Sequence, residues 1–427
     1  MERGSPKVLF AGHISLDIIP DLSQVTGGFE VFRPGGLVLV DGVRFTTGGA
    51  VLNTGLALHR LGSSVRLLIH IGADPYGRIL RELVKSALHS RTAAHAEKPR
   101  SDVVVLEREG EQTSFTFVFS PKDTDRMFVS CPGTNSRFRL DDIEDEFLQG
   151  IELFHFGYPP LLQHVYLDGG ESLARMLKGL QRRGIVTSLD MCMPDLQGAS
   201  GQVDWRSFLS RVLPYVDVFM PSVEELFFML RPRTFLCESQ FAVGLPAGQK
   251  LWEADLAEMA QTLVDMGTRI AGIKLGDQGL YVRTGEVQHP GDASEASGTD
   301  PASGVGDAAH SRRPSWWQGL TAEKWNHREL YIPCFQAQVA GTTGAGDSTI
   351  AGFLSGLLHG LAPEECMTHA VAVGACSVEQ MDATSGIPTW EQVQGRLQKG
   401  WASLPPMVAL SNWAARDSLH YGPRDQK

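Results

Sequence analysis

The chain has 427 residues, of which 42% are hydrophobic and 20% are charged, and its formal net charge is −11. This length can bury a large core, either as one large α/β domain or as two smaller domains. The negative charge argues against nonspecific nucleic-acid binding, which needs basic patches. No apolar run reaches the roughly 20 residues that a helix needs to cross a bilayer, so no membrane partner is expected.

The N-terminal sequence and the cysteines indicate the cellular compartment in which the protein is expected. No signal peptide precedes Val8, and no two of the six cysteines form a Cys-x-x-Cys pair. Scattered free thiols are typical of a reducing compartment, so the sequence predicts a cytoplasmic protein. The expected free thiols are those of Cys131, Cys192, Cys237, Cys334, Cys366 and Cys376.

The first residues predict a buried strand over Val8–Gly12, because they form a short apolar run that ends in glycine. Asp17 then falls near the end of this strand, where open α/β sheets place ligand groups. Gly48 and Gly49 open the next helix, which carries Asn53. Two glycines let a ligand approach the backbone, and an asparagine both donates and accepts hydrogen bonds. Position alone leaves a solvated aspartate and a structural asparagine as alternatives.

Two segments have the character of a small sheet. Residues 20–47 mix short apolar runs with glycines, and residues 102–119 hold two apolar runs on either side of a turn. Together they predict a small β lid over the site. The alternative is a hairpin that only extends the core sheet.

From Ile151 onward, strand-like and helix-like segments alternate. This alternation predicts βαβ units and a mainly parallel sheet. Strands are expected at 153–156, 185–189, 216–220 and 269–273, and helices at 173–180, 223–230 and 256–266.

Polar residues follow several of these strands, at the edge where such sheets gather functional groups. Asp190 ends one strand, Glu225 follows the next, and Lys274 ends the strand that leads to Gly276 and Gly279. Carboxylates suit Mg²⁺, and a lysine can neutralise phosphate charge. The residues alone leave two alternatives open, a preference of Glu225 for a helix N-terminus and a surface position for Lys274.

The most informative stretch is Gly341–Gly352, with the sequence GTTGAGDSTIAG. Gly344, Ala345 and Gly346 have little or no side chain, and an apolar helical run follows Asp347. Glycines let backbone N–H groups converge, and a helix N-terminus adds unpaired N–H groups, so this stretch predicts an anion site, most obviously for phosphate. An aspartate beside a phosphate makes sense if it takes a proton from an attacking hydroxyl group. The alternative is a turn followed by a helix N-cap.

Residues 285–313 differ from the rest of the chain. They are rich in Gly, Ala, Ser and Asp and contain almost no large apolar residue, so they predict a disordered insertion. Trp316, Trp317 and Trp325 are expected to re-enter the fold after it. Residues 404–427 predict a surface tail.

The GTTGAGD string and the Gly-Gly-x-x-x-Asn string at Gly48–Asn53 resemble the two signatures of the ribokinase-like (PfkB) carbohydrate kinase family, in the family's order. The resemblance covers residues 7–400 apart from the insertion. It implies a three-layer α/β/α sandwich with a mainly parallel central sheet and a β lid from residues 20–47 and 102–119. It also implies ATP and Mg²⁺ as cofactors.

The resemblance assigns roles residue by residue. It implies that Asp347 is the catalytic base and that the loop of Gly344, Ala345 and Gly346 is an anion hole for the transferred phosphoryl group. The positions that match the family's acceptor site are Asp17, Gly48, Gly49 and Asn53. The positions that match its nucleotide site are Thr343, Lys274, Gly276 and Gly279. Those that match its magnesium site are Glu225 and Asp190.

The chain departs from the family pattern at three positions. Gly341 stands where an Asp is usual, Ser222 replaces an Asn, and Cys192 replaces another Asn. The Asp at the first position helps to hold an activating potassium ion in several members, so the resemblance does not extend to activation by a monovalent cation. Lids in this family often pair between subunits, which favours a homodimer.

The predicted function is ATP-dependent phosphoryl transfer to a hydroxyl group of a small sugar. A nucleoside kinase of the same family is the alternative acceptor class, and a non-catalytic sugar or nucleotide sensor is the alternative outside enzymes. The chain has no Gly-x-x-x-x-Gly-Lys-Ser/Thr string and no Gly-x-Gly-x-x-Gly after its first strand, which disfavours P-loop kinases and dinucleotide enzymes.

Overall fold

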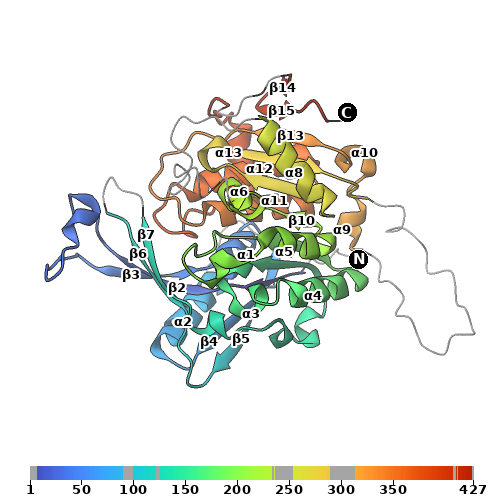
Figure 1. The fold of residues 1–427 in the computed structure, drawn as a ribbon. Coiled ribbons are helices and arrows are strands. Elements are labelled where there is room, and N and C mark those ends of the chain that lie inside the picture. Colours follow the sequence, from blue (N-terminus) through green and yellow to red (C-terminus); the bar gives the residue numbers. More distant parts are fainter. Residues whose placement is uncertain are drawn as a thin grey trace, which may run out of the picture.

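An eleven-stranded sheet runs through the centre of the molecule (Figure 1). The computed structural model describes residues 7–89, 100–121, 126–232, 235, 253–288, 313–406, 410 and 412–425. In spatial order the strands are β14 (Ala414–Arg416), β15 (Leu419–Tyr421), β13 (Glu329–Ile332), β12 (Leu280–Thr284), β11 (Ile270–Lys274), β10 (Val218–Phe219), β9 (Val186–Asp190), β8 (Ile151–Gly157), β1 (Lys7–Gly12), β4 (Ser64–Gly72) and β5 (Asp102–Arg108).

The strands from β11 to β5 pair in parallel, and the remaining strands pair antiparallel. Both faces of the parallel part are covered. Val8 and Phe10 of β1 pack into the core on one face, while Leu9 and Ala11 pack into the core on the other. This double burial explains why the first strand is an unbroken apolar run rather than an alternating one.

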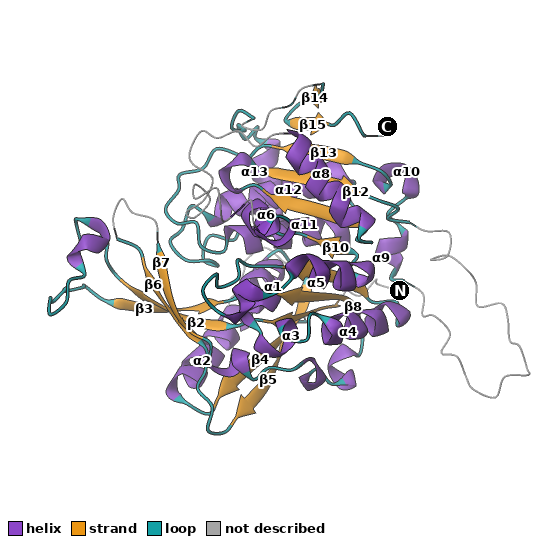
Figure 2. Ribbon diagram, viewed as in Figure 1, coloured by secondary structure: helices purple, strands orange, loops and turns teal. Residues whose placement is uncertain are grey.

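Helices form a layer on each face of the sheet (Figure 2). The first layer contains α1 (Ala50–Arg60), α2 (Pro75–His89), α9 (Ser315–Gln318), α10 (Ala322–Trp325), α11 (Ala345–Leu358), α12 (Pro363–Ser377) and α13 (Trp390–Gln398). The second contains α3 (Gln163–Tyr166), α4 (Glu171–Arg182), α5 (Trp205–Val212), α6 (Val223–Leu230) and α8 (Glu253–Asp265). The predicted three-layer architecture is therefore present, and each strand and helix predicted after Ile151 has a counterpart.

A separate four-stranded sheet forms the lid, which projects to the left of the main body in Figure 1. Its strands, in spatial order, are β3 (Val43–Gly48), β2 (Ser15–Pro20), β6 (Phe115–Phe119) and β7 (Met127–Cys131). Only the last five residues of the predicted segment 20–47 and its first residue are in strands, and a 3₁₀ turn lies at Gly28–Val31. Strand β7 was not predicted from the sequence.

The prediction that residues 102–119 belong wholly to the lid is wrong. Strand β5, which takes up the first part, pairs in parallel with β4 at the edge of the main sheet, and only β6 joins the lid. The physical reason is that β5 is apolar on both sides. Val103 and Val105 pack toward one core, and Val104 and Leu106 toward the other.

The prediction that Asp17 ends the first strand is also wrong. Strand β1 ends at Gly12, whose φ of 124° turns the chain out of the main sheet, and a Cβ at this position would overlap Gly157. Asp17 is the third residue of β2 and therefore belongs to the lid.

The C-terminal half holds two further differences. Residues 289–312 of the predicted insertion lie outside the described residues, whereas Val287 is buried and Arg313 pairs with the buried Asp217. Trp317 and Trp325 are buried as predicted, and Trp316 donates a hydrogen bond to Glu152. Residues 404–427 are more than a surface tail, because β14 and β15 extend the main sheet beyond β13.

Two chemical expectations concern the whole chain. Among the cysteines that the structure describes, none forms a disulfide, and Cys237 lies outside the described residues. None of the helices in the described ranges combines the length and hydropathy that crossing a bilayer requires.

Candidate active site

The GTTGAGD string forms a tight loop that leads into α11. Gly344 is the N-cap residue, and its left-handed φ of 74° favours glycine. A Cβ at Gly344 would also overlap the Ala383 side chain. The helix begins at Ala345, so Asp347 lies in its first turn, where it is 3% exposed. The loop thus ends at a helix N-terminus, whose unpaired backbone N–H groups are able to bind an anion.

The Asp347 carboxylate accepts three hydrogen bonds. Asn53 Nδ2 donates to Oδ2 at 3.0 Å, Thr54 Oγ1 donates to Oδ1 at 3.2 Å, and the Tyr158 hydroxyl donates to Oδ1 at 2.9 Å. Asn53 and Thr54 come from α1, and Tyr158 directly follows β8. Burial raises the pKa of Asp347 above its ordinary value, while the Lys274 ammonium group and the three donors oppose the rise.

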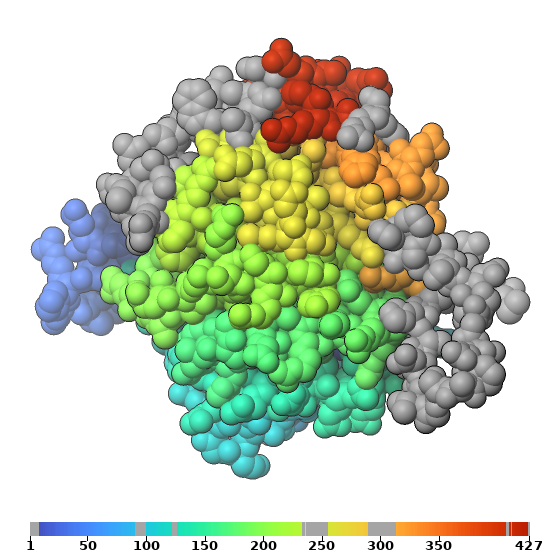
Figure 3. All heavy atoms as spheres, turned by 45° about the vertical axis from the view of Figure 1, so that its right-hand side comes forward, coloured from blue at the N-terminus to red at the C-terminus, as the bar shows by residue number. Residues whose placement is uncertain are grey.

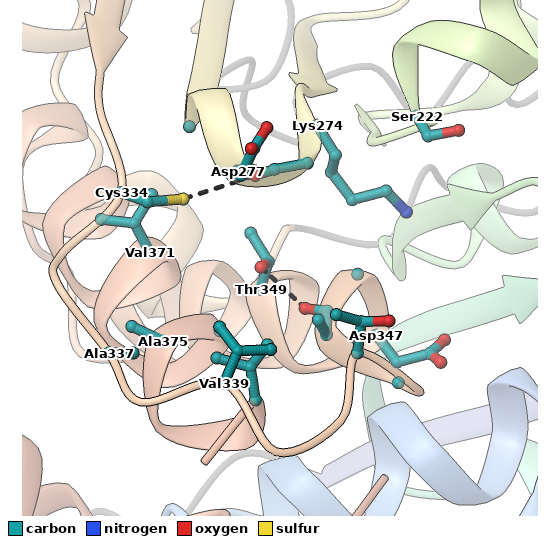
Figure 4. Close-up of a pocket in the computed structure, with 18 of the residues that line it drawn as sticks. Ser222, Lys274, Asp277, Cys334, Ala337, Val339, Asp347, Thr349, Val371 and Ala375 are labelled. Atoms are coloured by element: carbon teal, nitrogen blue, oxygen red, sulfur yellow. Dashed lines mark hydrogen bonds between the residues drawn. The ribbon is translucent and has the colours of Figure 1, made fainter. Parts of the chain in front are cut away.

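Lys274 is a buried residue of the site, and the alternative of a surface lysine is wrong. Its Nζ atom lies 2.7 Å from Asp190 Oδ1 and about 3.5 Å from the place of a Cβ on Gly346. Burial alone would lower the pKa of Lys274, but the carboxylates of Asp190 and Glu225 outweigh this effect and raise it. The lysine therefore carries its charge at the start of α11, facing Asp347 (Figure 4).

Asp190 and Glu225 are the carboxylates that the sequence associates with Mg²⁺. Glu225 Oε2 accepts the Ser222 backbone N–H at 2.8 Å, which makes Glu225 part of a capping box at the start of α6. Its helix N-terminal role is therefore real, yet the residue also lines the cavity of the site. Asp190 Oδ2 is buried and has no hydrogen-bond partner among the described atoms.

These groups fit one kind of magnesium site. No cluster of three or more His, Cys, Asp or Glu side chains arranged to hold a metal occurs in the described ranges. Magnesium retains several waters and is commonly held by one or two carboxylates together with substrate phosphates. Glu225 fits such an ion because it lines the cavity. Asp190 offers its unpartnered Oδ2 but is itself fully buried and is not among the cavity-lining residues. A cage made only of protein ligands does not fit the described residues.

The glycine pair before α1 lies against the lid. A Cβ at Gly48 would overlap the Asp17 carboxylate, and a Cβ at Gly49 would lie 2.7 Å from the His13 carbonyl oxygen. Asp17 is 7% exposed, and burial raises its pKa to about 7, with a smaller contribution from the charge of Asp347. The structure thus brings Asp17, Gly48, Gly49 and Asn53 together, and their role in binding an acceptor stays a prediction.

Unused hydrogen-bonding atoms remain beside this group. Asn53 Oδ1 and His13 Nδ1 are both buried and lack a partner among the described atoms. Burial lowers the pKa of His13 to about 3, with a further contribution from His70, so its ring is neutral. Buried polar atoms normally have partners, which makes these atoms candidates for contacts with a bound hydroxylated molecule.

A cavity of about 730 Å³ opens on the other side of Asp347. Its polar end holds Lys274, Glu225 and Asp347, together with Gly276, Gly279 and Gly346. Its apolar part is lined by Phe335, Ala337, Val339, Val371, Ala375, Val378 and Leu404 (Figure 4). Thr342 lines this cavity, while the predicted Thr343 is not among its lining residues. A cavity with one apolar end and one polar end that holds a lysine suits a molecule that has a flat ring and a phosphate chain.

Sequence reasoning missed several residues of the site. Tyr158 and His13 each follow the end of a main-sheet strand, so the strand-end rule that found Asp190 had the means to find them. Arg126 lines the cavity and hydrogen-bonds Thr342. It was missed together with β7, the strand that it precedes.

Comparison with known proteins places this chain in a family. The family model described as "pfkB family carbohydrate kinase" matches residues 6–310 and 317–390. An uncharacterised sugar kinase of Archaeoglobus fulgidus is 22% identical over 333 residues, which is 78% of this chain and 98% of that protein. A 5-dehydro-2-deoxygluconokinase of Geobacillus thermodenitrificans is 21% identical over 382 residues, covering 88% and 90% of the two chains.

Solved structures share the fold. A ribokinase of Arabidopsis thaliana in complex with ribose and ATP has a TM-score of 0.59 at 16% identity, and covers 93% of this chain and 99% of its own. A fructokinase of Xylella fastidiosa with bound ATP has a TM-score of 0.60 at 18% identity, and covers 92% and 98%. The predicted ribokinase-like fold and the predicted enzyme class, an ATP-dependent carbohydrate kinase, are confirmed. The chain belongs to the pfkB family of carbohydrate kinases.

Proposed function

We propose that this protein transfers the γ-phosphoryl group of ATP to a hydroxyl group of a small sugar, with Asp347 as the general base. The observation that carries the proposal is the position of Asp347. Its carboxylate lies between the phosphate end of the cavity and the group of Asp17, Asn53 and His13. A base placed there can reach an acceptor hydroxyl group that faces the γ-phosphorus atom.

Each role is proposed from the position of its residues in the site. The acceptor lies against Asp17, Gly48, Gly49 and Asn53, where buried polar atoms lack partners. The triphosphate lies along Gly276, Gly279 and Lys274, which line the cavity, with Thr343 beside them in the loop before α11, and the adenine base occupies the apolar part of the cavity. Glu225 and Asp190 would hold Mg²⁺ in part through water, and this ion neutralises phosphate charge when bound.

In the reaction, Asp347 takes the proton of the acceptor hydroxyl group as its oxygen bonds to the γ-phosphorus atom. The bond from that phosphorus atom to the bridging oxygen breaks, and ADP leaves with the electron pair. Backbone N–H groups of Thr343 to Gly346 and the Lys274 ammonium group stabilise the phosphoryl charge. Positioning and charge stabilisation supply most of the catalysis in such transfers.

The acceptor class is tested by ADP release with Mg-ATP against a panel of sugars, sugar phosphates and nucleosides. We expect turnover with a sugar. Turnover confined to nucleosides would support the alternative acceptor class. In its favour, a nucleoside kinase of Methanocaldococcus jannaschii is 40% identical over 73 residues, which are 17% of this chain and 24% of that protein. Binding of sugars without turnover of any acceptor would support the sensor.

A monovalent-cation site built on residue 341 does not fit this chain. Gly341 offers no carboxylate, and a Cβ there would lie 3.0 Å from the Gln380 carbonyl oxygen. We therefore propose that turnover is the same in potassium and in tetramethylammonium salts. A large gain of rate in potassium would contradict this.

We also propose a homodimer in which lids pair. The lid stands out from the body (Figure 3, blue) and carries large apolar side chains on both of its edge strands and on the loop before β3. The exposed ones are Phe32, Leu37, Leu39, Val40, Val43, Phe45, Met127, Phe128 and Val129. Such a patch on an open sheet edge is typical of an interaction surface.

Sedimentation of the protein tests the dimer. Val129→Lys on β7 should give monomers, whereas Leu167→Lys, at an equally exposed position away from the lid, should leave the dimer intact. A wild-type monomer at micromolar concentration would contradict the proposal. The cytoplasmic location stays a prediction, supported by the unpaired thiols of the described cysteines.

A further inference from the structure

Tyr158 is a residue of the site that neither family signature contains. It follows Gly157 at the end of β8, lines the cavity, and donates its hydroxyl hydrogen to Asp347 Oδ1 at 2.9 Å. Its ring also lies 5.8 Å from the His13 ring, measured between centroids. The phenol therefore lies between the cavity and the proposed acceptor side of Asp347.

The backbone of Tyr158 is held in an unusual conformation. Its φ of 61° and ψ of 52° are left-handed, which bulky residues adopt rarely. The backbone N–H donates to the Asp190 carbonyl oxygen at 3.2 Å, and the Tyr158 carbonyl oxygen accepts from the Leu161 N–H at 3.0 Å. Strained residues of this kind persist where their surroundings hold them, and they concentrate at functional sites. Here the conformation directs the phenol toward Asp347.

The hydrogen bonds of Asp347 distinguish its two oxygens. An ionised carboxylate offers about four acceptor positions, two on each oxygen. Tyr158 and Thr54 both donate to Oδ1, whereas only Asn53 donates to Oδ2. One acceptor position on Oδ2 therefore remains for an incoming hydroxyl group.

We propose that Tyr158 is a positioning residue for phosphoryl transfer, which together with Thr54 occupies Oδ1 of Asp347 and leaves Oδ2 to take the acceptor's proton. The inference rests on the proposed function. In the step, the proton passes from the acceptor hydroxyl group to Oδ2. The acceptor oxygen bonds to the γ-phosphorus atom, the bond to the bridging oxygen of ADP breaks, and the proton is later lost from Asp347 to solvent.

The chemistry of the phenol suits this role. Burial raises the pKa of Tyr158 well above its ordinary value, and the nearby charge of Asp347 adds to the rise. Tyr158 is therefore protonated at neutral pH and donates to Asp347.

Other groups also act on Asp347 and have to be held constant. From α1 come Asn53 and Thr54, and from β2 comes Asp17. The remaining titratable neighbours, on β9, β11 and α6 or beside them, are Asp190, Cys192, Lys274 and Glu225. Replacing only the hydroxyl group of Tyr158 leaves all of these in place, so a change in titration reports on that one donor.

The test is Tyr158→Phe. Loss of a donor destabilises the carboxylate, so the pKa of Asp347 rises and the acidic limb of the kcat profile moves up by about one pH unit. The plateau kcat falls about tenfold, as expected for one hydrogen bond to a charged group, while the acceptor KM changes little. Thr54→Val should shift the limb in the same direction. Tyr166→Phe, on α3 and outside the cavity lining, should leave it unchanged.

A second readout does not depend on turnover. The carboxyl carbon of Asp347, labelled with ¹³C and assigned by comparison with Asp347→Asn, should titrate at higher pH in Tyr158→Phe than in the wild type. If no acceptor is turned over, the proposed function fails while this titration still tests the contact.

Two results would overturn the inference. One is an active Tyr158→Phe enzyme whose acidic limb and ¹³C titration match the wild type. The other is a lower acceptor KM with an unmoved acidic limb, which would mean that the phenol occupies the place of the acceptor hydroxyl group.

Discussion

At the scale of single residues, the site is organised by charge that is buried and compensated. Lys274 Nζ and Asp190 Oδ1 are 2.7 Å apart, with 11% and 1% of the two side chains exposed. Removing two charges from water is costly, and the cost is offset only while both partners are present. The same lysine faces the start of α11. Loss of the pair is therefore expected to affect both the stability of the fold and the proposed phosphate end of the cavity.

Lys274→Met should lower the free energy of unfolding by about 3–5 kcal/mol, because it leaves Asp190 as a buried carboxylate without its cation. Urea denaturation measures this. The double variant Lys274→Met with Asp190→Leu should recover much of the stability but none of the activity. Equal instability of the single and double variants would show that the pair is not coupled.

Asp17 makes the stability of the fold depend on pH. Its pKa is raised by burial to about 7, so between roughly pH 4 and pH 7 the folded chain binds a proton that the unfolded chain has lost. The contribution of this group to stability is therefore present below pH 4 and is lost as the pH rises to 7. Asp17→Asn should remove this decrease in the free energy of unfolding, which is at most about 4 kcal/mol.

Unfolding free energies of the wild type and Asp17→Asn at pH 5 and pH 8 measure this effect. We expect the free energy of unfolding of Asp17→Asn to increase relative to that of the wild type between pH 5 and pH 8. A difference between the two proteins that is the same at both pH values would contradict the account. His13 acts in the opposite sense at low pH, since its pKa is lowered to about 3 and its stabilising effect appears as the pH rises toward 6.5.

At the scale of elements, the contact of α11 with α12 places Asp347. Gly352 faces the backbone of α12, where a Cβ would lie 2.7 Å from the His369 carbonyl oxygen, and at Gly356 a Cβ would lie 2.9 Å from Cys366 Sγ. The two helices approach closely because these positions lack side chains. The small residues in this part of the sequence are therefore a packing requirement.

Gly352→Ala should destabilise the fold by about 1–3 kcal/mol through overpacking, and should lower kcat by displacing α11. Gly395→Ala on α13 is the matched control, because no atom lies within 4 Å of its Cβ position. That change should stabilise the protein by about 0.5–1 kcal/mol through helix propensity. The melting temperatures of both variants, compared with that of the wild type, test this prediction. An equal change in the two variants would rule out close packing of α11 and α12 as the cause.

At the scale of the whole molecule, the C-terminus completes the main sheet. Arg328 is fully buried, and its Nε atom donates to both carboxylate oxygens of Asp425 at 3.0 and 3.1 Å, while Nη2 pairs with Glu364 at 2.7 Å. Asp425 follows β15, Arg328 precedes β13, and Glu364 lies in α12. These contacts therefore hold β15 beside β13 and against the helical layer that contains α12.

Asp425→Asn should cost about 1.5–3 kcal/mol, the usual effect of losing a hydrogen bond to a charged group. Asp417→Asn, an exposed aspartate between β14 and β15, should have little effect. Differential scanning calorimetry compares the two. If both variants melt as the wild type does, the C-terminal contact is not a stabilising one.

The parts of the fold that the sequence predicts are those with local signals. The GTTGAGD loop, the alternation after Ile151 and the glycine pair before α1 each depend on neighbouring residues, and all three lie where expected. The errors concern long-range pairing. Strand β5 was able to pair in the main sheet or in the lid, and β14 and β15 were able to lie on the surface or to join the main sheet. Each outcome depends on partner strands elsewhere in the sequence. Tyr158 lies just beyond a predicted strand, but its contact with Asp347 joins residues 189 positions apart, and no local signal indicates that contact.

The most direct test of the central claim is kcat of Asp347→Asn beside its binding of ADP and of the sugar found in the acceptor panel. The account predicts a fall in kcat of at least about a hundredfold, since a general base is removed, with both affinities retained. Turnover close to that of the wild type would contradict the assignment of Asp347 as the base.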